Sequence, residues 1–225
     1  MKVIARIYTD FEEKFGIPRQ SGLVKSLRGR IVFEEAYRSA EALRGLEGFD
    51  YIWLLWKFQG VEEDHWSPMV KPPRLGGKRR MGVFATRSPF RPNAIGLSSV
   101  KLEGIEYTEE GPVLLVSGAD MKNRTPIYDI KPYLAYTDSH PQAREGFARE
   151  GREHELSVEF PEELLEFIPR DKREPLLEIL KLDPRPGYHE DENRKYGVAF
   201  AGYDVHFLVR GNVLTVFEVV PYIQP

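Results

Sequence analysis

The sequence predicts a mainly β protein, with a small antiparallel barrel or sandwich followed by a smaller α+β domain. In the first 139 residues, eight short runs rich in β-branched and aromatic residues are interrupted by only one helix-like segment. Turn signals such as Glu-Glu-Gly-Pro at 109–112 separate neighbouring runs, which favours an antiparallel barrel or sandwich over a parallel α/β sheet. After residue 152 the pattern changes to a strand, two helices and a hairpin.

The expected elements of the first domain follow from these runs. We expect strands at residues 3–8, 23–26, 30–35, 51–58, 81–86, 98–106, 112–119 and 127–133, and a helix around 39–46. The run at 51–58, YIWLLWKF, is apolar at both alternating sets of positions, so it predicts a central strand that is covered on both faces. Trp53 and Trp56 are therefore expected in the core.

The polar and charged residues that follow position 139 predict a linker at 140–152, which divides the chain into domains at 1–139 and 153–225. The second domain is expected to begin with a strand at 156–160. A helix then starts at Pro161, with acidic residues in its first turn. A second helix is predicted over 173–182, with its leucines on one stripe. Strands at 197–209 and 212–220, joined by Arg210-Gly211, are expected to form a hairpin.

Composition excludes several classes of protein and of site. The chain has 225 residues, 41% of them hydrophobic, and can bury a core, but no apolar run approaches the roughly 20 residues of a membrane helix. With no secretory signal in residues 1–10, we expect a soluble cytoplasmic protein that does not contact membranes. The absence of cysteine excludes disulfides and thiolate sites, and the five widely spaced histidines favour no metal. No Rossmann glycine fingerprint, P-loop or Gly-x-Ser-x-Gly elbow is present.

Positive charge is concentrated in residues 65–102. This stretch has no acidic residue, although the net charge of the chain is -3. Its cations are Lys71, Arg74, Lys78, Arg79, Arg80, Arg87, Arg91 and Lys101. Such segregation predicts a polyanionic partner. Three proline-bearing loops, at 16–20, 87–93 and 123–126, have restricted backbones and can hold polar groups in place around a ligand.

These segments resemble the TsaA-like family, the TrmO-type tRNA (adenosine-N6)-methyltransferases. The resemblance rests on GVFATRSPFRPNAIGLS at 82–98, PPRLGG at 72–77 and DIKPYL at 129–134. It covers roughly residues 4–139 as the barrel, and the rest is similar to the smaller C-terminal domain of bacterial members. The resemblance implies a barrel that binds S-adenosylmethionine without a Rossmann sheet, a homodimer, and methylation of N6 of threonylcarbamoyl-adenosine beside the anticodon of tRNA.

The resemblance also implies which residues bind the cofactor. A Pro-Arg-Gln loop of the family matches Pro18, Arg19 and Gln20, and the end of the long central strand matches Gln59 and Gly60. The Ala-Thr-Arg arginine and the leucine ten positions later match Arg87 and Leu97. A final Asp-Gly-Thr-Pro turn matches Asn123, Arg124, Thr125 and Pro126. The chain departs from the family pattern where Gln59 replaces a histidine of some members, and where Asn123-Arg124 replaces Asp-Gly, which removes a carboxylate and a glycine that tolerates positive φ.

Methyl transfer from a sulfonium to nitrogen needs alignment of donor and acceptor, and orientation of this kind can supply about 7–11 kcal/mol of barrier reduction. Leu97 suits the adenine of the cofactor, and Arg19 or Arg87 suits its carboxylate. Asp129, Tyr133 and Asp138 are candidate bases, although Asp129 is equally suited to pair with Lys131. The catalytic base is therefore unassigned.

Recognition of an RNA loop uses stacking aromatics together with cations on phosphates, a description that fits Lys78, Arg79, Arg80, Phe90 and Arg91. We expect these residues to bind the anticodon arm of tRNA. Two alternatives stay open from the residues alone: a non-catalytic module that binds a nucleotide or RNA and regulates a partner, and an enzyme that acts on a small adenosine derivative. The acid-free stretch argues against the second.

Overall fold

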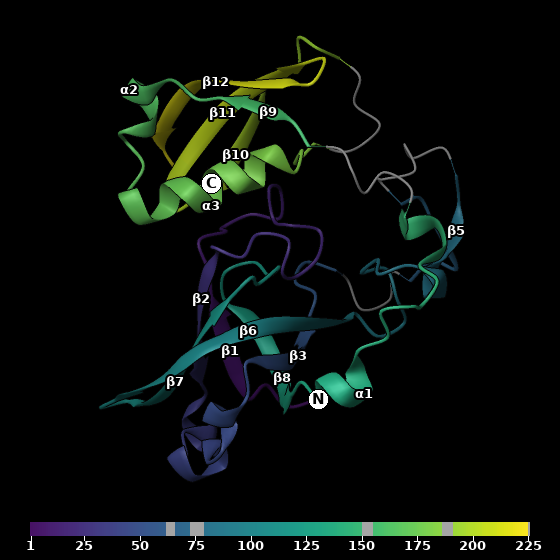
Figure 1. Ribbon diagram of the computed structural model, residues 1–225, viewed down its shortest axis with the longest axis vertical. Helices are drawn as coiled ribbons and strands as arrows, with labels where there is room; N and C mark the ends of the chain where they lie inside the picture. Colours follow the sequence, from purple (N-terminus) through teal and green to yellow (C-terminus); the bar gives the residue numbers. More distant parts are fainter. Residues whose placement is uncertain (62–65, 73–78, 150–154, 186–190, 225) are drawn as a thin grey trace.

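The computed structural model describes residues 1–61, 66–72, 79–149, 155–185 and 191–224. Six strands close into a barrel in the order β1-β2-β7-β6-β3-β8 (Figure 1). Their bounds are β1 Ala5–Tyr8, β2 Arg28–Phe33, β3 Tyr51–Lys57, β6 Ile95–Thr108, β7 Gly111–Ser117 and β8 Thr125–Pro132. Every neighbouring pair is antiparallel, and the pairing of β1 with β8 closes the ring. The predicted antiparallel barrel is confirmed.

The barrel interior is filled by alternate residues of each strand, as closure of a sheet requires. On β3, Ile52, Leu54 and Trp56 are buried, so the prediction that Trp56 lies in the core is confirmed. Trp53 faces outward and donates a hydrogen bond from Nε1 to Asp138 Oδ2 at 2.7 Å. The expectation that both faces of this strand are covered is wrong, since in a closed barrel only one face lines the core and Tyr51, on the other, is 42% exposed.

Three elements predicted in the first domain differ from the structure. Residues 23–26 form a turn and no strand, because Val24 and Leu27 are buried in a second core. The helix predicted over 39–46 is replaced by short 3-10 helices, η1 Glu35–Tyr37, η2 Ala40–Leu43 and η3 Leu46–Gly48, with Gly45 at φ 89° between the last two. The strand predicted over 81–86 is only β5, Met81–Gly82, which pairs with β4, Met69–Val70, and is followed by the 3-10 helix η5, Val83–Ala85.

The alternating direction of the strands places each connection at one of the two ends, or rims, of the barrel. The connections 9–27, 58–94 and 118–124, which join β1 to β2, β3 to β6 and β7 to β8, lie at one rim, called here the long-loop rim. The connections 34–50 and 109–110 lie at the opposite rim. Because all neighbouring strands are antiparallel, three connections distant in sequence meet at the long-loop rim.

The second unit is a four-stranded sheet with helices. Its elements are β9 Ser157–Glu159, α2 Glu162–Leu165, α3 Arg170–Lys181, β10 Tyr196–Phe200, β11 Tyr203–Arg210 and β12 Val213–Pro221, and the strand order is β10-β11-β12-β9. The predicted strand 197–209 is two strands, because the chain reverses at Ala201-Gly202, where φ is 51° and 83°. The second helix begins at Arg170, three residues earlier than predicted. Short helices α1 Ala135–Asp138 and η6 Gly146–Arg149 lie between the two units.

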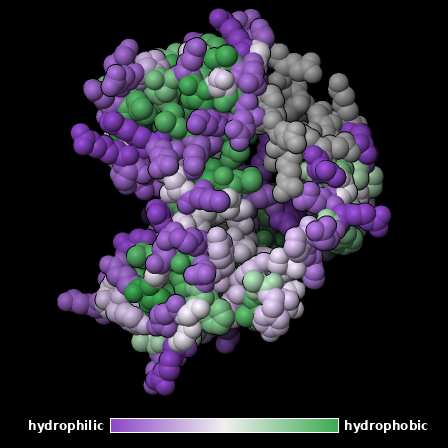
Figure 2. All heavy atoms as spheres, viewed as in Figure 1, coloured by the Kyte–Doolittle hydropathy of each residue, from purple (hydrophilic) through white to green (hydrophobic). Residues whose placement is uncertain are grey.

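The second core includes residues from the barrel half of the sequence. Phe11, Val24 and Leu27 of the 9–27 connection are buried in the same cluster as Ile168, Leu176 and other apolar residues of the second unit. The two lobes are visible in Figure 2, with an indentation between them on one side. The division of the chain at 140–152 stays a prediction. Within the described ranges, no helix is long and apolar enough to cross a membrane.

Candidate functional site

The residues predicted to bind the cofactor gather at the long-loop rim. Pro18, Arg19 and Gln20 lie in the 9–27 connection, whereas Gln59, Gly60 and Arg87 lie in the 58–94 connection. Asn123 and Arg124 end the 118–124 connection, and Thr125 and Pro126 begin β8. Leu97 is the third residue of β6, close to the same rim. The barrel thus brings residues more than 100 positions apart to one end of the molecule.

Gln20 and Arg87 are in direct contact. The Arg87 guanidinium donates a hydrogen bond to Gln20 Oε1, and the Gln20 amide donates to the carbonyl of Arg19. This chain of contacts joins the 9–27 and 58–94 connections. Leu97 lies on the outer face of β6, opposite Leu55 of β3, and is 55% exposed. Leu97 therefore offers an apolar surface, and the Arg87–Gln20 pair a charged group, at the same rim of the barrel.

A hydrogen-bonded chain from the barrel core supports this corner, and sequence reasoning missed it. Trp56 Nε1 donates to Ser98 Oγ at 3.0 Å, and Ser98 Oγ donates to Asp120 Oδ1 at 2.6 Å. Asp120 also accepts a hydrogen bond from the backbone N–H of Ser21. Burial raises the pKa of Asp120, against the opposing effects of Ser98, the backbone N–H groups and the Arg87 charge. The available signals were Ser98 inside the family motif and an Asp directly after the strand predicted over 112–119.

A polar cavity of about 350 Å³ contains the second group of predicted residues. Its lining residues are Arg6, Glu12, Gln59, Lys122, Asn123, Arg124 and Gln224. Three are cations and one is an acid, so the cavity favours an anionic group. Gly60 lies beside it along the chain, and Lys14 Nζ donates to the Gly60 carbonyl at 3.4 Å.

The turn that departs from the family pattern keeps a tight geometry. Arg124 adopts φ 60°, the left-handed conformation for which glycine is favoured. Asn123 replaces the carboxylate as an acceptor, since its Oδ1 accepts the Thr9 N–H at 3.2 Å, while its Nδ2 donates to Glu12 at 2.7 Å. Thr125 Oγ1 donates to the Lys122 carbonyl at 2.7 Å. Side-chain hydrogen bonds therefore hold this turn without a glycine.

Arg19 is directed away from this cavity and toward the second unit. Its Nη2 donates to the carbonyls of Asp183 and Arg185, at 3.4 and 2.9 Å, just after α3. Pro18 is buried and Arg19 is exposed. Of the two arginines considered for the cofactor carboxylate, Arg87 is thus the one whose guanidinium contacts the other predicted residues.

Part of the basic segment forms a small subassembly around β4 and β5. Arg79 and Arg80 are exposed, Phe90 is 48% exposed, and Lys78 lies outside the described residues. Arg91 is half-buried and donates to the carbonyls of Val83 and Thr86 at 3.3 and 2.7 Å, so it holds its own loop in shape.

Phe84 extends the aromatic surface of this subassembly. The Arg91 guanidinium lies 5.8 Å from the centre of the Phe84 ring, and Phe84 is 73% exposed. Such an exposed ring beside a cation can stack on an unpaired base. Sequence reasoning named Phe90 and not Phe84, although Phe84 lies inside the recognised motif.

The three candidate bases have partners in the structure. Asp129 pairs with Lys131 at 3.0 Å. Tyr133 packs on Trp53, with ring centroids 5.6 Å apart. Asp138 accepts hydrogen bonds from the Leu134 N–H and from Trp53, which together lower the pKa of its carboxyl. The catalytic base stays unassigned.

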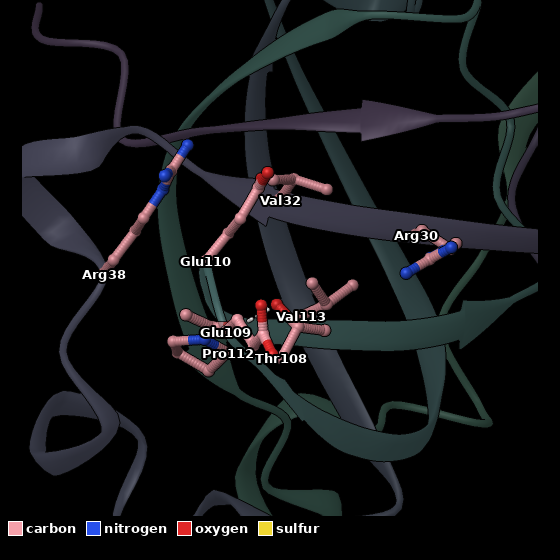
Figure 3. A pocket seen from close by; sticks show the side chains of 9 residues that line it. Arg30, Val32, Arg38, Thr108, Glu109, Glu110, Pro112 and Val113 are labelled. Carbon is pink, nitrogen blue, oxygen red and sulfur yellow. Dashed lines mark hydrogen bonds between the residues drawn. The ribbon is translucent and has the colours of Figure 1, made fainter.

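A larger cavity, of about 420 Å³, lies at the opposite rim and includes none of the predicted residues. Arg30 and Arg38 lie toward opposite ends of this cavity, with Glu109 and Glu110 between them (Figure 3). Arg30 pairs with Glu106, and Arg38 donates to the Phe33 carbonyl. These arginines do not converge on one point, which argues against a ligand site there. In the described part of the chain, no group of three or more potential ligands could hold a metal ion.

Comparisons with known proteins agree along nearly the whole chain. The family model for the tRNA-methyltransferase O N-terminal domain matches residues 6–139, and the model for the TrmO C-terminal domain matches 153–222. The chain is 40% identical over 226 residues to a tRNA (adenine(37)-N6)-methyltransferase of Escherichia coli K12, covering 97% of this chain and 96% of that protein. It is 41% identical over 212 residues to a putative S-adenosylmethionine-dependent methyltransferase, RcsF, of Pseudomonas aeruginosa, covering 91% and 90%.

Solved structures of TrmO are also similar to this chain over nearly its whole length. A crystal structure of TrmO from Pseudomonas aeruginosa is 34% identical in sequence and superposes with a TM-score of 0.79. The match covers 99% of this chain and 97% of that protein. Another crystal structure of TrmO is also 34% identical and has a TM-score of 0.76, with 97% and 98% covered. Both the barrel and the second unit fall within these matches.

Proposed function

Because this chain belongs to the tRNA-methyltransferase O family, we propose that it is an S-adenosylmethionine-dependent methyltransferase that methylates N6 of threonylcarbamoyl-adenosine beside the anticodon of tRNA. The match of family models to both parts of the chain supports this activity. So does the near full-length similarity to a protein named tRNA (adenine(37)-N6)-methyltransferase. The single structural observation that carries the proposal is the convergence of three distant connections at the long-loop rim.

The residues at this rim fit the chemical parts of the cofactor. The exposed Leu97 offers an apolar surface for the adenine, and the Arg87 guanidinium, fixed by Gln20, offers a charge for the carboxylate. The cation-rich cavity at Gln59, Asn123 and Arg124 lies at the same rim. The bound cofactor supplies the methyl group from its sulfonium. The protein residues hold it, orient the acceptor and exclude water, and orientation alone is worth about 7–11 kcal/mol.

We propose that the tRNA lies on the subassembly around β4 and β5. In this proposal the exposed Arg79 and Arg80 contact phosphates, and the exposed Phe84 and Phe90 stack on unpaired bases of the anticodon loop. Lys78, which the sequence predicts to contact phosphates as well, lies outside the described residues. Arg91 contributes by holding Phe84 and its own loop. Arg87 lies in the same 58–94 connection, so one connection carries residues of both the proposed RNA surface and the proposed cofactor site.

The proposal extends to assembly and location. A homodimer that works in the cytoplasm without a metal is consistent with the family resemblance. Tyr51, which is 42% exposed on the outer face of the barrel, is apolar surface available to a second copy. Sedimentation of the purified protein measures this, and a monomer at micromolar concentration would contradict it.

Two measurements test the function. Calorimetry with S-adenosylmethionine is expected to show binding that Arg87→Ala weakens, because the charge for the carboxylate is lost. Labelled methyl transfer into total tRNA from a strain that lacks this modification is expected to give label in one class of nucleoside, identified by mass spectrometry. Tight cofactor binding without transfer of label to tRNA would instead support the non-catalytic module.

A further inference from the structure

We propose that the second unit of the protein positions the cofactor loop, residues 18–20, and that Arg19 is a positioning residue in this arrangement. This inference rests on the proposed function, since it assumes that the loop binds S-adenosylmethionine. In Figure 1 the 9–27 connection, which carries the loop, runs between the barrel and α3. Its two ends belong to β1 and β2 of the barrel, whereas much of its length is packed in the second core.

Apolar contacts anchor the connection on both sides of the loop. Before the loop, Phe11 packs on Phe200 at 5.4 Å between ring centroids, and Phe15 stacks on Tyr196 at 6.2 Å with the rings 8° from parallel. After the loop, Val24 and Leu27 are almost completely buried, at 1% and 3% exposed. The loop is thus suspended between two apolar anchors that both lie in the second core.

Polar contacts also anchor the 9–27 connection to the second unit on both sides of the loop. Lys172 of α3 pairs with Asp10 at 2.7 Å, and both side chains are at least three-quarters buried. The Ala201 N–H donates to the Asp10 carbonyl at 2.9 Å. On the other side, Ser26 Oγ donates to Glu178 of α3 at 2.5 Å.

Arg19 connects the loop itself to the second unit. Its guanidinium donates to the Asp183 and Arg185 carbonyls, which follow α3. The next residue, Gln20, accepts the hydrogen bond from Arg87. A displacement of α3 is therefore transmitted through Arg19 to the contact that positions Arg87.

Gly16 shows how closely the connection approaches the sheet. A Cβ at this position would lie 2.7 Å from Val198 Cγ1 and 3.2 Å from Cγ2, and φ is 91°. Only a residue without a side chain allows the backbone to lie against β10 in this conformation. The three atoms nearest to this Cβ all belong to Val198 of the second unit, so a substitution here disturbs docking without removing any group proposed to touch the cofactor.

A set of variants outside the cofactor residues tests the proposal. Gly16→Ala pushes the connection off Val198, and Lys172→Met removes the ion pair to Asp10. The controls are Gly45→Ala, which has nearly the same φ of 89° but nothing within 4 Å, and Glu174→Gln on the exposed side of α3. Calorimetry measures the affinity of each full-length variant for S-adenosylmethionine, and steady-state kinetics separates kcat from KM.

We expect the Gly16 and Lys172 variants to bind S-adenosylmethionine about tenfold more weakly than wild type, because the loop is no longer preorganised. KM for the cofactor should rise by a similar factor, with kcat and KM for tRNA within about twofold of wild type. Adding Val198→Ala to Gly16→Ala removes the two clashing methyl groups and should recover part of the affinity. The two controls should bind like wild type.

The outcomes separate this inference from the proposed function. If wild type binds no cofactor, both are overturned. If wild type binds and Arg87→Ala weakens binding, but the Gly16 and Lys172 variants bind as tightly as wild type, only the positioning role is overturned. Circular dichroism at the assay temperature checks folding, and if Gly16→Ala does not fold, Lys172→Met decides alone. A loss of kcat with unchanged KM for the cofactor would also contradict the proposal.

Discussion

Replacement of Gly96 by alanine tests whether the corner of the proposed cofactor site depends on close packing in the barrel. A Cβ at Gly96 would lie 2.2, 2.4 and 2.6 Å from three atoms of the Trp56 indole. Carbon atoms in contact prefer about 3.5 Å, so the indole must retreat by about 1.3 Å. Trp56 Nε1 lies 3.0 Å from Ser98 Oγ, and a shift of this size breaks the hydrogen bond that leads on to Asp120.

The expected cost combines two effects. Overpacking of a core costs about 1–3 kcal/mol, and the lost hydrogen bond adds about 1 kcal/mol, so the free energy of unfolding should fall by about 2–4 kcal/mol. Cofactor affinity should fall as well, because Asp120 holds the Ser21 N–H beside the loop. Urea unfolding followed by tryptophan fluorescence measures the first effect, and calorimetry measures the second.

Gly104→Ala is the matched control. Gly104 lies on the same strand, β6, and a Cβ there meets nothing within 4 Å. Its free energy of unfolding should stay within about 1 kcal/mol of wild type. Equal stability of the Gly96 and Gly104 variants would refute the packing argument, since it would mean that Trp56 moves aside without cost.

Three further predictions concern stability and RNA. The Ser117 hydrogen bond, assisted by basic neighbours, lowers the pKa of Glu103 from 4.5 to about 2, so its stabilisation is present above pH 4.5 and is lost as pH falls toward 2. A lowering of the pKa from 4.5 to about 2 is worth about 3.4 kcal/mol in full, which solvent screening reduces to about 1–2 kcal/mol. Glu103→Gln should lose this stabilisation at pH 7 and almost nothing at pH 2, and urea unfolding at the two pH values measures the difference. Changing Arg79 and Arg80 together to Ala should lower the salt slope of tRNA binding by about 2, measured by filter binding from 50 to 200 mM salt, and an unchanged slope would contradict their contact with phosphates. Phe84→Leu should weaken tRNA binding by about 1–3 kcal/mol in the same assay while Phe84→Trp retains it, and equal loss in both would argue against stacking.

The sequence predicts the barrel well because a closed antiparallel sheet leaves a local signal. Alternation and turn residues mark five of its strands to within two residues at either end, and the prediction for the sixth, β6, starts three residues late. The surroundings of Trp53 could not be predicted, since its run is apolar on both sets of positions and only closure decides which set faces inward. The strand predicted at 23–26 is wrong for a similar reason. Val24 is apolar because it packs in a core to which residues more than 100 positions away contribute.

The residues of the candidate site could be predicted from the sequence, but the hydrogen bonds that join them could not. Recognition of motif residues supplied Gln20, Arg87 and Leu97, whereas no local pattern indicates that Asp120 meets Ser98 across the barrel. The direction of Arg19 toward the second unit was equally hidden, because its partners are backbone carbonyls, which any residue provides. The side chains of a loop therefore indicate which ligand it can bind, whereas the contacts that fix the loop in position are known only from the fold.

Hydrogen exchange with bound S-adenosylhomocysteine tests the central claim most directly, because it reports where the cofactor lies without requiring catalysis. The account predicts protection in the connections 9–27, 58–94 and 118–124, with the rim formed by 34–50 and 109–110 exchanging as in the free protein. Protection confined to the 34–50 and 109–110 connections, or equal exchange everywhere at saturating ligand, would contradict it.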